Sequence, residues 1–422
     1  MIPAIGWLAV LLLAGFAGVA SVAHGTGSAS VEAFDSGPRV SYRALESMLE
    51  RYLLLRDAGG WPAFSAAGST LGTGDASTEI PALRDILWRT SDLAENARGS
   101  TLYDGELQRA VQRFQLRHGL ATDGIVGPRT RQALSVDVDA RIKQLRLNLE
   151  RSRRLPRDLG ERYIWINTAA FELDVHEGDR VALSMRVIVG KEKQQTPAFT
   201  ESMRYLVVNP YWHVPTKLAK RDLIPALLRN PDYFTQRGIR VLSGWRADAT
   251  ELDPLAIDWR EYSGDRYLPY KLRQDPGPSN PLGRIKFMLP NRYSVYLHDT
   301  PGKHLFERPV RALSSGCVRL EKPLELARYV MGTEGSGGIS REQLEVIIGT
   351  GHNQTVSLPE PIPVYLVYQT AWVDTDGNAQ FRHDVYGRDP ALAARIQPKL
   401  SAGGGPEHAG KLSASSILPA PK

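Results

Sequence analysis

Residues 293–320 read YSVYLHDTPGKHLFERPVRALSSGCVRL, and this stretch holds the only cysteine of the chain, Cys317. Apolar residues alternate with polar ones before His298, which predicts a β-strand that ends at this histidine. Cys317 follows nineteen positions later in an SSGCVR turn. A thiol nucleophile needs a base, and a strand-end imidazole packed against a glycine turn can supply one. The stretch therefore predicts a strand and a turn that bring a Cys–His pair together.

The alternative interpretation is that Cys317 is a small buried hydrophobe and His298 a surface residue, which is the commoner fate of a lone cysteine. The Ser-Ser-Gly context and the cation of Arg319 argue against it, because free backbone N–H groups and a nearby positive charge both favour the thiolate. Arg319 could also form a structural salt bridge, and the sequence leaves that open.

The HDTP and SSGCVRL motifs resemble the catalytic signature of the L,D-transpeptidases, which have the YkuD fold. Ser315 stands where the commoner motif has a histidine, and this variant is similar to the large periplasmic YcbB-like subgroup. The segment NPYWHVP at residues 209–215 resembles the same subgroup. The departure at Ser315 leaves His298 as the only candidate base near the cysteine in sequence.

The resemblance implies a peptidoglycan enzyme. Cys317 would attack the carbonyl between the third and fourth residues of a donor stem tetrapeptide, and a second stem would resolve the thioester into a 3-3 cross-link. His298 would act as base and then as acid. The N–H of Cys317, with that of Ser315 or Gly316, would bind the oxyanion. The family orients its histidine with a backbone carbonyl, so the side chain of Asp299 receives no catalytic role; carbapenem-type inhibitors would acylate the cysteine.

Three aromatic residues are candidate substrate contacts. Tyr296 lies two positions before His298, on the same face of the predicted strand, so it could line the donor groove or be a core aromatic. Trp245 and Trp259 belong to an insertion at residues 217–281 in which the β pattern is lost. In the resembled subgroup this insertion caps the substrate; a packed structural insertion with its own aromatic core is an equal alternative.

Upstream, residues 110–134 read AVQRFQLRHGLATDGIVGPRTRQAL and closely resemble the type 1 peptidoglycan-binding domain, a small three-helix module. We assign this module to residues 101–136; a plain helical hairpin is the alternative. Arg113, Arg117 and Arg129 could meet stem-peptide carboxylates, although exposed helical arginines are usually only solvated.

The predicted fold class is α+β: a small helical peptidoglycan-binding and scaffold region, then a β-rich YkuD-type catalytic domain with a long lid insertion. Apolar residues at helical spacing predict the scaffold, and the period changes to two from Tyr163 onward. The predicted order is a signal peptide or anchor at 1–23, a linker at 24–39, a helical scaffold at 40–100, the module at 101–136, a connecting helix at 137–160, the catalytic domain at 161–390 and a disordered tail at 397–422.

An apolar run at residues 5–22 ends in Ser-Val-Ala, which predicts a secretory signal cleaved after Ala23. An uncleaved membrane anchor is the alternative, because the run reaches the lower end of spanning length. Either interpretation exports the body, and the resemblance implies the periplasm or cell envelope. A cysteine with no internal partner in an oxidising space favours a reactive role.

Composition narrows the class of protein further. The chain has 422 residues, 42% of them hydrophobic, which predicts two or three globular domains. A net charge of +6 suits an acidic polymer such as a cell wall and is weaker than a nucleic-acid footprint. One cysteine and nine scattered histidines predict no metal site, and we expect no cofactor. Two other functions stay open: an L,D-carboxypeptidase or amidase with water as acceptor, and a non-catalytic wall-binding protein.

Overall fold

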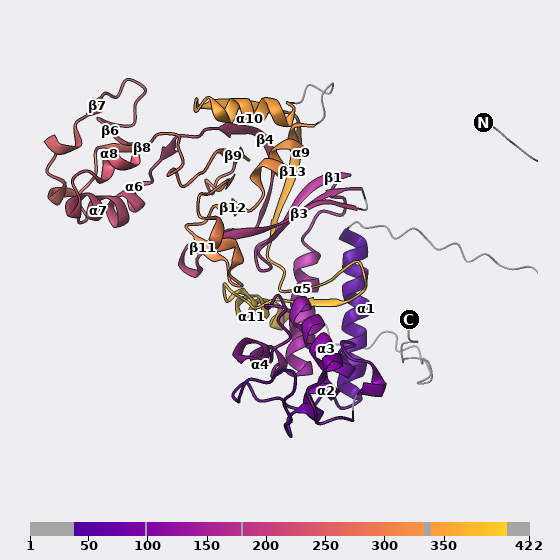
Figure 1. Cartoon of the computed structure of the whole chain (residues 1–422). Coiled ribbons are helices and arrows are strands. Elements are labelled where there is room, and N and C mark those ends of the chain that lie inside the picture. Colours follow the sequence, from indigo (N-terminus) through magenta and orange to yellow (C-terminus); the bar gives the residue numbers. More distant parts are fainter. Residues whose placement is uncertain (1–37, 98, 179, 333–338, 403–422) are drawn as a thin grey trace, which may run out of the picture. The chain divides into compact units, whose positions relative to one another are not determined.

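The computed structural model describes residues 38–97, 99–178, 180–332 and 339–402 (Figure 1). The predicted signal segment and nearly all of the predicted linker lie outside these residues. Among the described helices, none combines the length and the apolar character that crossing a membrane requires.

The N-terminal part of the described chain is helical, as the apolar spacing predicts. Aspartates begin two of its helices: Asp104 accepts a hydrogen bond from the Leu107 amide at 2.8 Å, and Asp137 accepts one from the Ala140 amide at 2.7 Å. The elements are α1 (Pro38–Asp57), α2 (Ile80–Arg89), η1 (Glu95–Ala97), α3 (Gly105–Arg117), α4 (Pro128–Leu134) and α5 (Val138–Ser152).

One hydrophobic core joins α2, α3 and α4 and extends back to Phe64. Arg131 of α4 is 1% exposed and pairs with Glu79, which directly precedes α2. The module thus packs as a unit that includes α2, a helix that the sequence had placed in the scaffold rather than in residues 101–136. A second core joins α1 to an apolar stripe of α5 formed by Ile142, Leu145 and Leu149.

From Arg162 onward the chain builds a nine-stranded sheet in the order β11-β3-β12-β10-β9-β4-β13-β1-β2. β2 also pairs with β3, so the sheet curls back on itself. Apolar side chains from these strands form the largest core, to which α9 (Pro323–Met331) and α10 (Arg341–Gly349) add residues. The strands are β1 (Arg162–Asn167), β2 (Glu172–Glu177), β3 (Arg180–Gly190), β4 (Phe199–Val208), β9 (Ile285–Met288), β10 (Leu297–His298), β11 (Ala312–Ser314), β12 (Val318–Leu320) and β13 (Gln354–Val367). Two short 3-10 turns, η2 (Glu192–Gln194) and η6 (Lys303–Glu307), interrupt the connections.

The insertion between β4 and β9 folds as a small unit with its own four-stranded sheet, in the order β5-β8-β6-β7, and its own apolar core. Trp259 is a member of that core and is 4% exposed. Its elements are β5 (Trp212–His213), α6 (Thr216–Leu218), the π-helical turn η3 (Ala219–Leu223), α7 (Ile224–Arg229), α8 (Tyr233–Arg237), β6 (Ile239–Leu242), β7 (Glu251–Leu252), η4 (Pro254–Ala256), η5 (Trp259–Tyr262) and β8 (Lys271–Gln274).

The C-terminal segment differs from its predicted place at the end of the catalytic domain. Strands β14 (Ala371–Val373) and β15 (Ala379–Phe381) pair only with each other and pack against α1 and α5. Helix α11 (Arg388–Ala402) continues past Gln397, where the sequence predicted a disordered tail.

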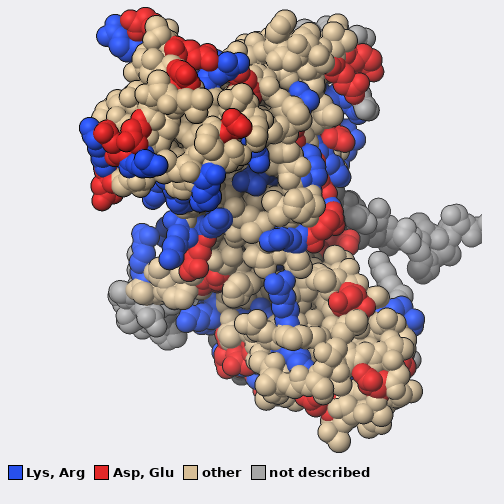
Figure 2. All heavy atoms as spheres, turned by 60° about the vertical axis from the view of Figure 1, so that its left-hand side comes forward, with Lys and Arg blue, Asp and Glu red and all other residues tan. Residues whose placement is uncertain are grey.

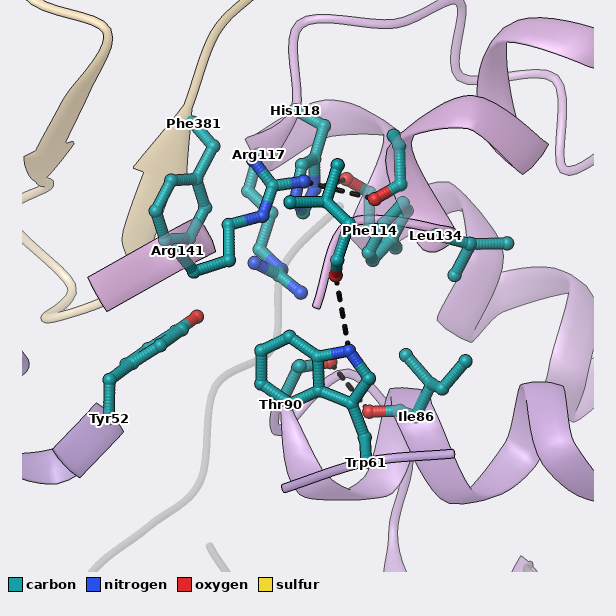
Figure 3. Close-up of a pocket in the computed structure, with 12 residues that line it drawn as sticks. Tyr52, Trp61, Ile86, Thr90, Phe114, Arg117, His118, Leu134, Arg141 and Phe381 are labelled. Atoms are coloured by element: carbon teal, nitrogen blue, oxygen red, sulfur yellow. Dashed lines mark hydrogen bonds between the residues drawn. The ribbon is translucent and has the colours of Figure 1, made fainter. Parts of the chain in front are cut away.

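Phe381 anchors this hairpin against α1, α5 and the end of α3 (Figure 3). Its ring lies 5.7 Å from that of Tyr52, and the guanidinium of Arg141 lies 4.6 Å from its centre. Arg117 forms a buried ion pair with Asp92 beside them. The void that remains is about 10 Å³, roughly the space of one water molecule, so the junction is a packed contact and not a ligand site.

Candidate active site

The site lies on one face of two neighbouring parallel strands. In the register of β10 and β12, Leu297 is opposite Val318 and His298 is opposite Arg319. Leu297 and Val318 are fully buried in the main core. Because successive side chains of a strand point to opposite faces, His298 and Arg319 share the other face.

The same alternation brings the remaining candidates to this face. Tyr296 and Cys317 each precede the paired residues by two positions, and the ring centres of Tyr296 and His298 are 5.7 Å apart. The neighbouring strand β9 places Lys286 opposite His298. Lys286 Nζ lies 3.9 Å from the ring centre of Tyr296. Lys286 was not singled out from the sequence; only its alternation with Ile285 and Phe287 could have indicated its face.

The cysteine turn is built by its own serine and by glycine. Ser314 Oγ donates to the carbonyl of Cys317 at 2.6 Å and accepts from the amide of Gly316 at 3.1 Å. Gly316 has φ +120°, a conformation that a side chain would strain. The Gly316 amide is therefore engaged, which removes it from the predicted oxyanion donors. In the described part of the chain, the amides of Ser315 and Cys317 donate to no protein acceptor.

Thr196 ties the turn to the rest of the domain, a contact that sequence reasoning missed. Its Oγ1 donates to the carbonyl of Gly316 at 2.8 Å and accepts from the Gly190 amide at 2.9 Å. Tyr386 in turn donates its hydroxyl to the carbonyl of Gly190 at 2.8 Å. The cysteine turn is thus held by Thr196, by β3 and, through β3, by Tyr386 of the C-terminal segment.

His298 is oriented by a backbone carbonyl. Its Nδ1 lies 2.5 Å from the carbonyl oxygen of Asp299, so Nδ1 carries the proton and Nε2 is the acceptor nitrogen. The carboxylate of Asp299 is used elsewhere, because it accepts from the Arg284 amide and from Lys303 Nζ. Burial and the positive charge of Arg319 lower the pKa of His298 to about 3, which keeps the ring neutral at physiological pH.

The thiol differs from the expectation of a ready-made thiolate. Burial raises the pKa of Cys317, although Tyr296, Lys286 and Arg319 each act to lower it. Arg319 does favour the anion, but burial outweighs it. The same surroundings raise the pKa of Tyr296, through burial and the neighbouring Cys317.

The electrostatic surroundings of the cysteine are cationic. Among the described residues, no carboxylate lies within salt-bridge distance of Arg319, and its Nε has no hydrogen-bond partner. The structural salt bridge considered for Arg319 is therefore absent from the described chain. Figure 2 shows the side of the molecule on which the insertion comes forward, and Lys and Arg side chains gather across the middle of this view.

Charges of the catalytic domain act on two residues of the insertion. Partial burial, together with Lys271 of the insertion and Lys286 of the catalytic sheet, lowers the pKa of His213. Arg221 and, more weakly, Lys191 lower the pKa of Asp222. The Lys191 amide donates a hydrogen bond to the carbonyl of Ser314, at the end of β11, at 3.0 Å.

The two tryptophans predicted as substrate contacts differ in exposure. Trp259 is buried inside the insertion, where its Nε1 donates to the Pro254 carbonyl at 2.7 Å, so its assignment as a substrate contact was wrong. Trp245 is 51% exposed, with Lys271 Nζ 5.6 Å from its ring centre. The predicted arginines of the module differ in exposure: Arg117 is buried against Asp92, whereas Arg113 and Arg129 are exposed, and Arg113 donates to the Asp92 carbonyl.

Two segments match known families. Residues 161–348 match YkuD, the L,D-transpeptidase catalytic domain, and residues 78–134 match a family described as "Putative peptidoglycan binding domain". The chain thus carries a YkuD-type L,D-transpeptidase catalytic domain and a peptidoglycan-binding domain. The second match begins at residue 78, ahead of α2, in agreement with the core that includes this helix. The YcbB-like subgroup stays a prediction.

A curated protein of Haemophilus influenzae, named "Putative L,D-transpeptidase", is 34% identical over 247 residues, which are 58% of this chain. The match spans about half of that relative, 48% of its length. Among solved structures, an L,D-transpeptidase from Xylanimonas cellulosilytica is 16% identical with a TM-score of 0.21, and covers 71% of this chain and 98% of its own. One from Stackebrandtia nassauensis is 12% identical with a TM-score of 0.24, and covers 72% and 97%.

Proposed function

We propose that the protein is a peptidoglycan L,D-transpeptidase that forms 3-3 cross-links through a thioester on Cys317. The observation that carries the proposal is the shared strand face of Cys317 and His298 within a matched L,D-transpeptidase catalytic domain. Peptidoglycan lies outside the cytoplasmic membrane, so the activity requires an extracytoplasmic location, and we propose the periplasm.

In the acylation step, Sγ of Cys317 bonds to the carbonyl carbon of the third residue of the donor tetrapeptide. The thiol proton passes to Nε2 of His298, and the amides of Cys317 and Ser315 stabilise the oxyanion. The C–N bond to the terminal D-alanine then breaks, and the imidazolium gives its proton to the leaving amine. Because the resting thiol and imidazole are both neutral, the proton moves as Sγ attacks and not before.

In the second step the side-chain amine of another stem attacks the thioester carbonyl. His298 takes a proton from that amine, the S–C bond breaks, and the sulfur is reprotonated. Water in place of the amine would make the same enzyme a carboxypeptidase. The cationic face, with Lys286 and Arg319 beside the sulfur, supports binding of stem peptides, which carry carboxylates.

Related enzymes suggest an inhibitor class. An L,D-transpeptidase named LdtMt1, 12% identical over 49% of this chain with a TM-score of 0.23, was solved in complex with imipenem, a carbapenem. We propose that carbapenem-type β-lactams acylate Cys317 here, since the thiol would attack the strained lactam carbonyl as it attacks the donor.

The test is incubation of the purified protein with disaccharide-tetrapeptide and mass analysis for dimers. The parent should form dimers and release D-alanine, and Cys317→Ala should do neither while keeping the parent's thermal unfolding, because the replacement only removes the attacking sulfur. D-alanine release by Cys317→Ala would refute the mechanism. Tripeptide without dimer from the parent would favour the carboxypeptidase.

A further inference from the structure

A groove of about 1300 Å³ lies away from the cysteine face. None of Cys317, His298, Lys286 or Arg319 lines it. One wall comes from the helical region, with α4, α5 and the turn after α3. The other wall comes from the start of β2, the segment around Arg311 and the β14–β15 hairpin.

Hydrogen bonds tie the walls together. Arg382, directly after β15, donates through Nη1 to the Arg117 carbonyl at 3.0 Å. Gln144 of α5 donates to the carbonyls of Thr370 and Arg382, at 2.8 and 3.0 Å. The groove is therefore a built feature of the fold, and the peptidoglycan-binding module supplies only part of it.

The hairpin wall carries an aromatic platform. Trp372 is partly exposed and lines the groove, and the guanidinium of Arg382 lies 4.6 Å from its ring centre. The Arg382 side chain is 8% exposed, yet its Nε has no hydrogen-bond partner. Its nearest carboxylate, Glu172, is 3.7 Å from Nη2. An indole next to an unsatisfied donor and a loosely held carboxylate suits a sugar ring, which has an apolar face and a rim of hydroxyls.

The helical wall offers free cations. Arg129 of α4 and Lys143 of α5 are both exposed, and neither forms an ion pair within the described residues. By contrast, Arg186 on the opposite wall is paired with Glu307 and Glu321. An anionic ligand would find its uncompensated charge at Arg129 and Lys143.

We propose that this groove binds a peptidoglycan segment, with a sugar ring on Trp372 and a stem-peptide carboxylate on Arg129 and Lys143. The identity of the polymer rests on the proposed function. The volume exceeds the roughly 300–1,000 Å³ of ordinary small-molecule pockets, as a segment of a polymer requires. The groove would hold the wall while the cysteine face processes a stem.

The test is isothermal titration of the full chain carrying Cys317→Ala with disaccharide-tetrapeptide. The Cys317→Ala chain, which is the parent for the variants below, should show two binding sites, the groove and the cysteine face. Arg129→Ala with Lys143→Ala should weaken the groove site about tenfold or more, the worth of a charge-assisted hydrogen bond, as should Trp372→Ala. Arg146→Ala, an exposed arginine of the same helix that does not line the groove, and Trp245→Ala should leave this site unchanged.

Two outcomes would overturn the proposal: a single site in the parent, or groove variants that bind as tightly as the parent. The proposed function fails separately, because β-lactam acylation of Cys317 in the otherwise unaltered chain does not use the groove. If Trp372→Ala does not fold, the exposed pair Arg129 and Lys143 decides alone. Equal binding of heparin would show a non-specific cationic surface and would also overturn the proposal.

Discussion

At the residue scale, the site combines a neutral imidazole with a thiol that burial keeps protonated. His298 can accept a proton because its Nδ1 is committed to the Asp299 carbonyl. Cys317 gains nucleophilicity only when that proton leaves, and Lys286 and Arg319 favour the resulting negative charge. This arrangement avoids a standing thiolate, which is the form that oxidises most readily.

His298→Ala should lower the rate of β-lactam acylation by about 10²–10⁴, the usual worth of a positioned proton-transfer group. Ser315→Ala should cost far less, because its proposed contribution is a backbone amide that alanine retains. Stopped-flow loss of β-lactam absorbance would measure both. The reverse ranking would mean that the serine in place of the motif histidine has moved catalysis elsewhere.

Burial raises the pKa of Cys317 above its ordinary value of 9.0, so the thiolate fraction at neutral pH is smaller than in a free cysteine. Alkylation by iodoacetamide should therefore be slow at pH 7 and keep rising as the pH passes 9. Lys286→Ala should shift the profile to still higher pH by removing a stabilising cation. The single cysteine makes the assay site-specific by mass. A plateau below pH 8 would contradict the raised pKa.

At the scale of elements, the insertion is a folded unit and not a loose loop. Its own sheet and core bury Trp259, whereas Trp245 and Tyr267 remain exposed, at 51% and 76%. It is therefore a folded unit with exposed aromatic residues, as a substrate lid would have. A lid of this kind would exclude water from the thioester and favour the amine acceptor.

Trp259→Ala should destabilise the insertion by about 3–5 kcal/mol, since the substitution opens a cavity in its core. Trp245→Ala should leave the unfolding temperature unchanged and lower the ratio of cross-linked dimer to hydrolysed tripeptide. Calorimetry and product mass together separate the two effects. An unchanged product ratio in Trp245→Ala would leave that residue without a role at the lid.

Periodicity explains which elements could be predicted. The helices at 38–57 and 138–152 and the long strands of the sheet carry clear apolar patterns. The pairing of Cys317 with His298 was predicted from the sequence motif instead. The strand predicted to end at His298 has only two residues, β10, because Ser294 adopts φ +56° and turns the chain before it. The burial of Trp259 and the place of the β14–β15 hairpin depend on contacts between distant segments, which no local pattern encodes.

At the scale of the molecule, residues far apart in sequence couple helix α5 to the segment that follows β13. Asn148 Nδ2 donates to Thr370 Oγ1 at 2.8 Å, and Arg151 pairs with Asp389 at 2.6 Å. The chain that leaves β13 thus returns to the helices and fixes them against the domain that holds the cysteine. A wall-binding groove between these parts would then have a defined position relative to the catalytic face.

Phe381→Ala tests this coupling. Phe381 is 1% exposed between Tyr52, His118 and Arg141, so truncation should cost about 3–5 kcal/mol at the junction and leave the separate cores of the module and sheet intact. We expect thermal unfolding to split into two transitions. β-Lactam acylation of Cys317 should survive, because no neighbour of Cys317 touches Phe381, while cross-linking of intact sacculi should fall.

Phe234→Ala, which removes an equally buried ring from the insertion, is the control and should leave the module transition in place. A single, uniformly lowered transition in Phe381→Ala would show instead that the module and the sheet unfold as one unit.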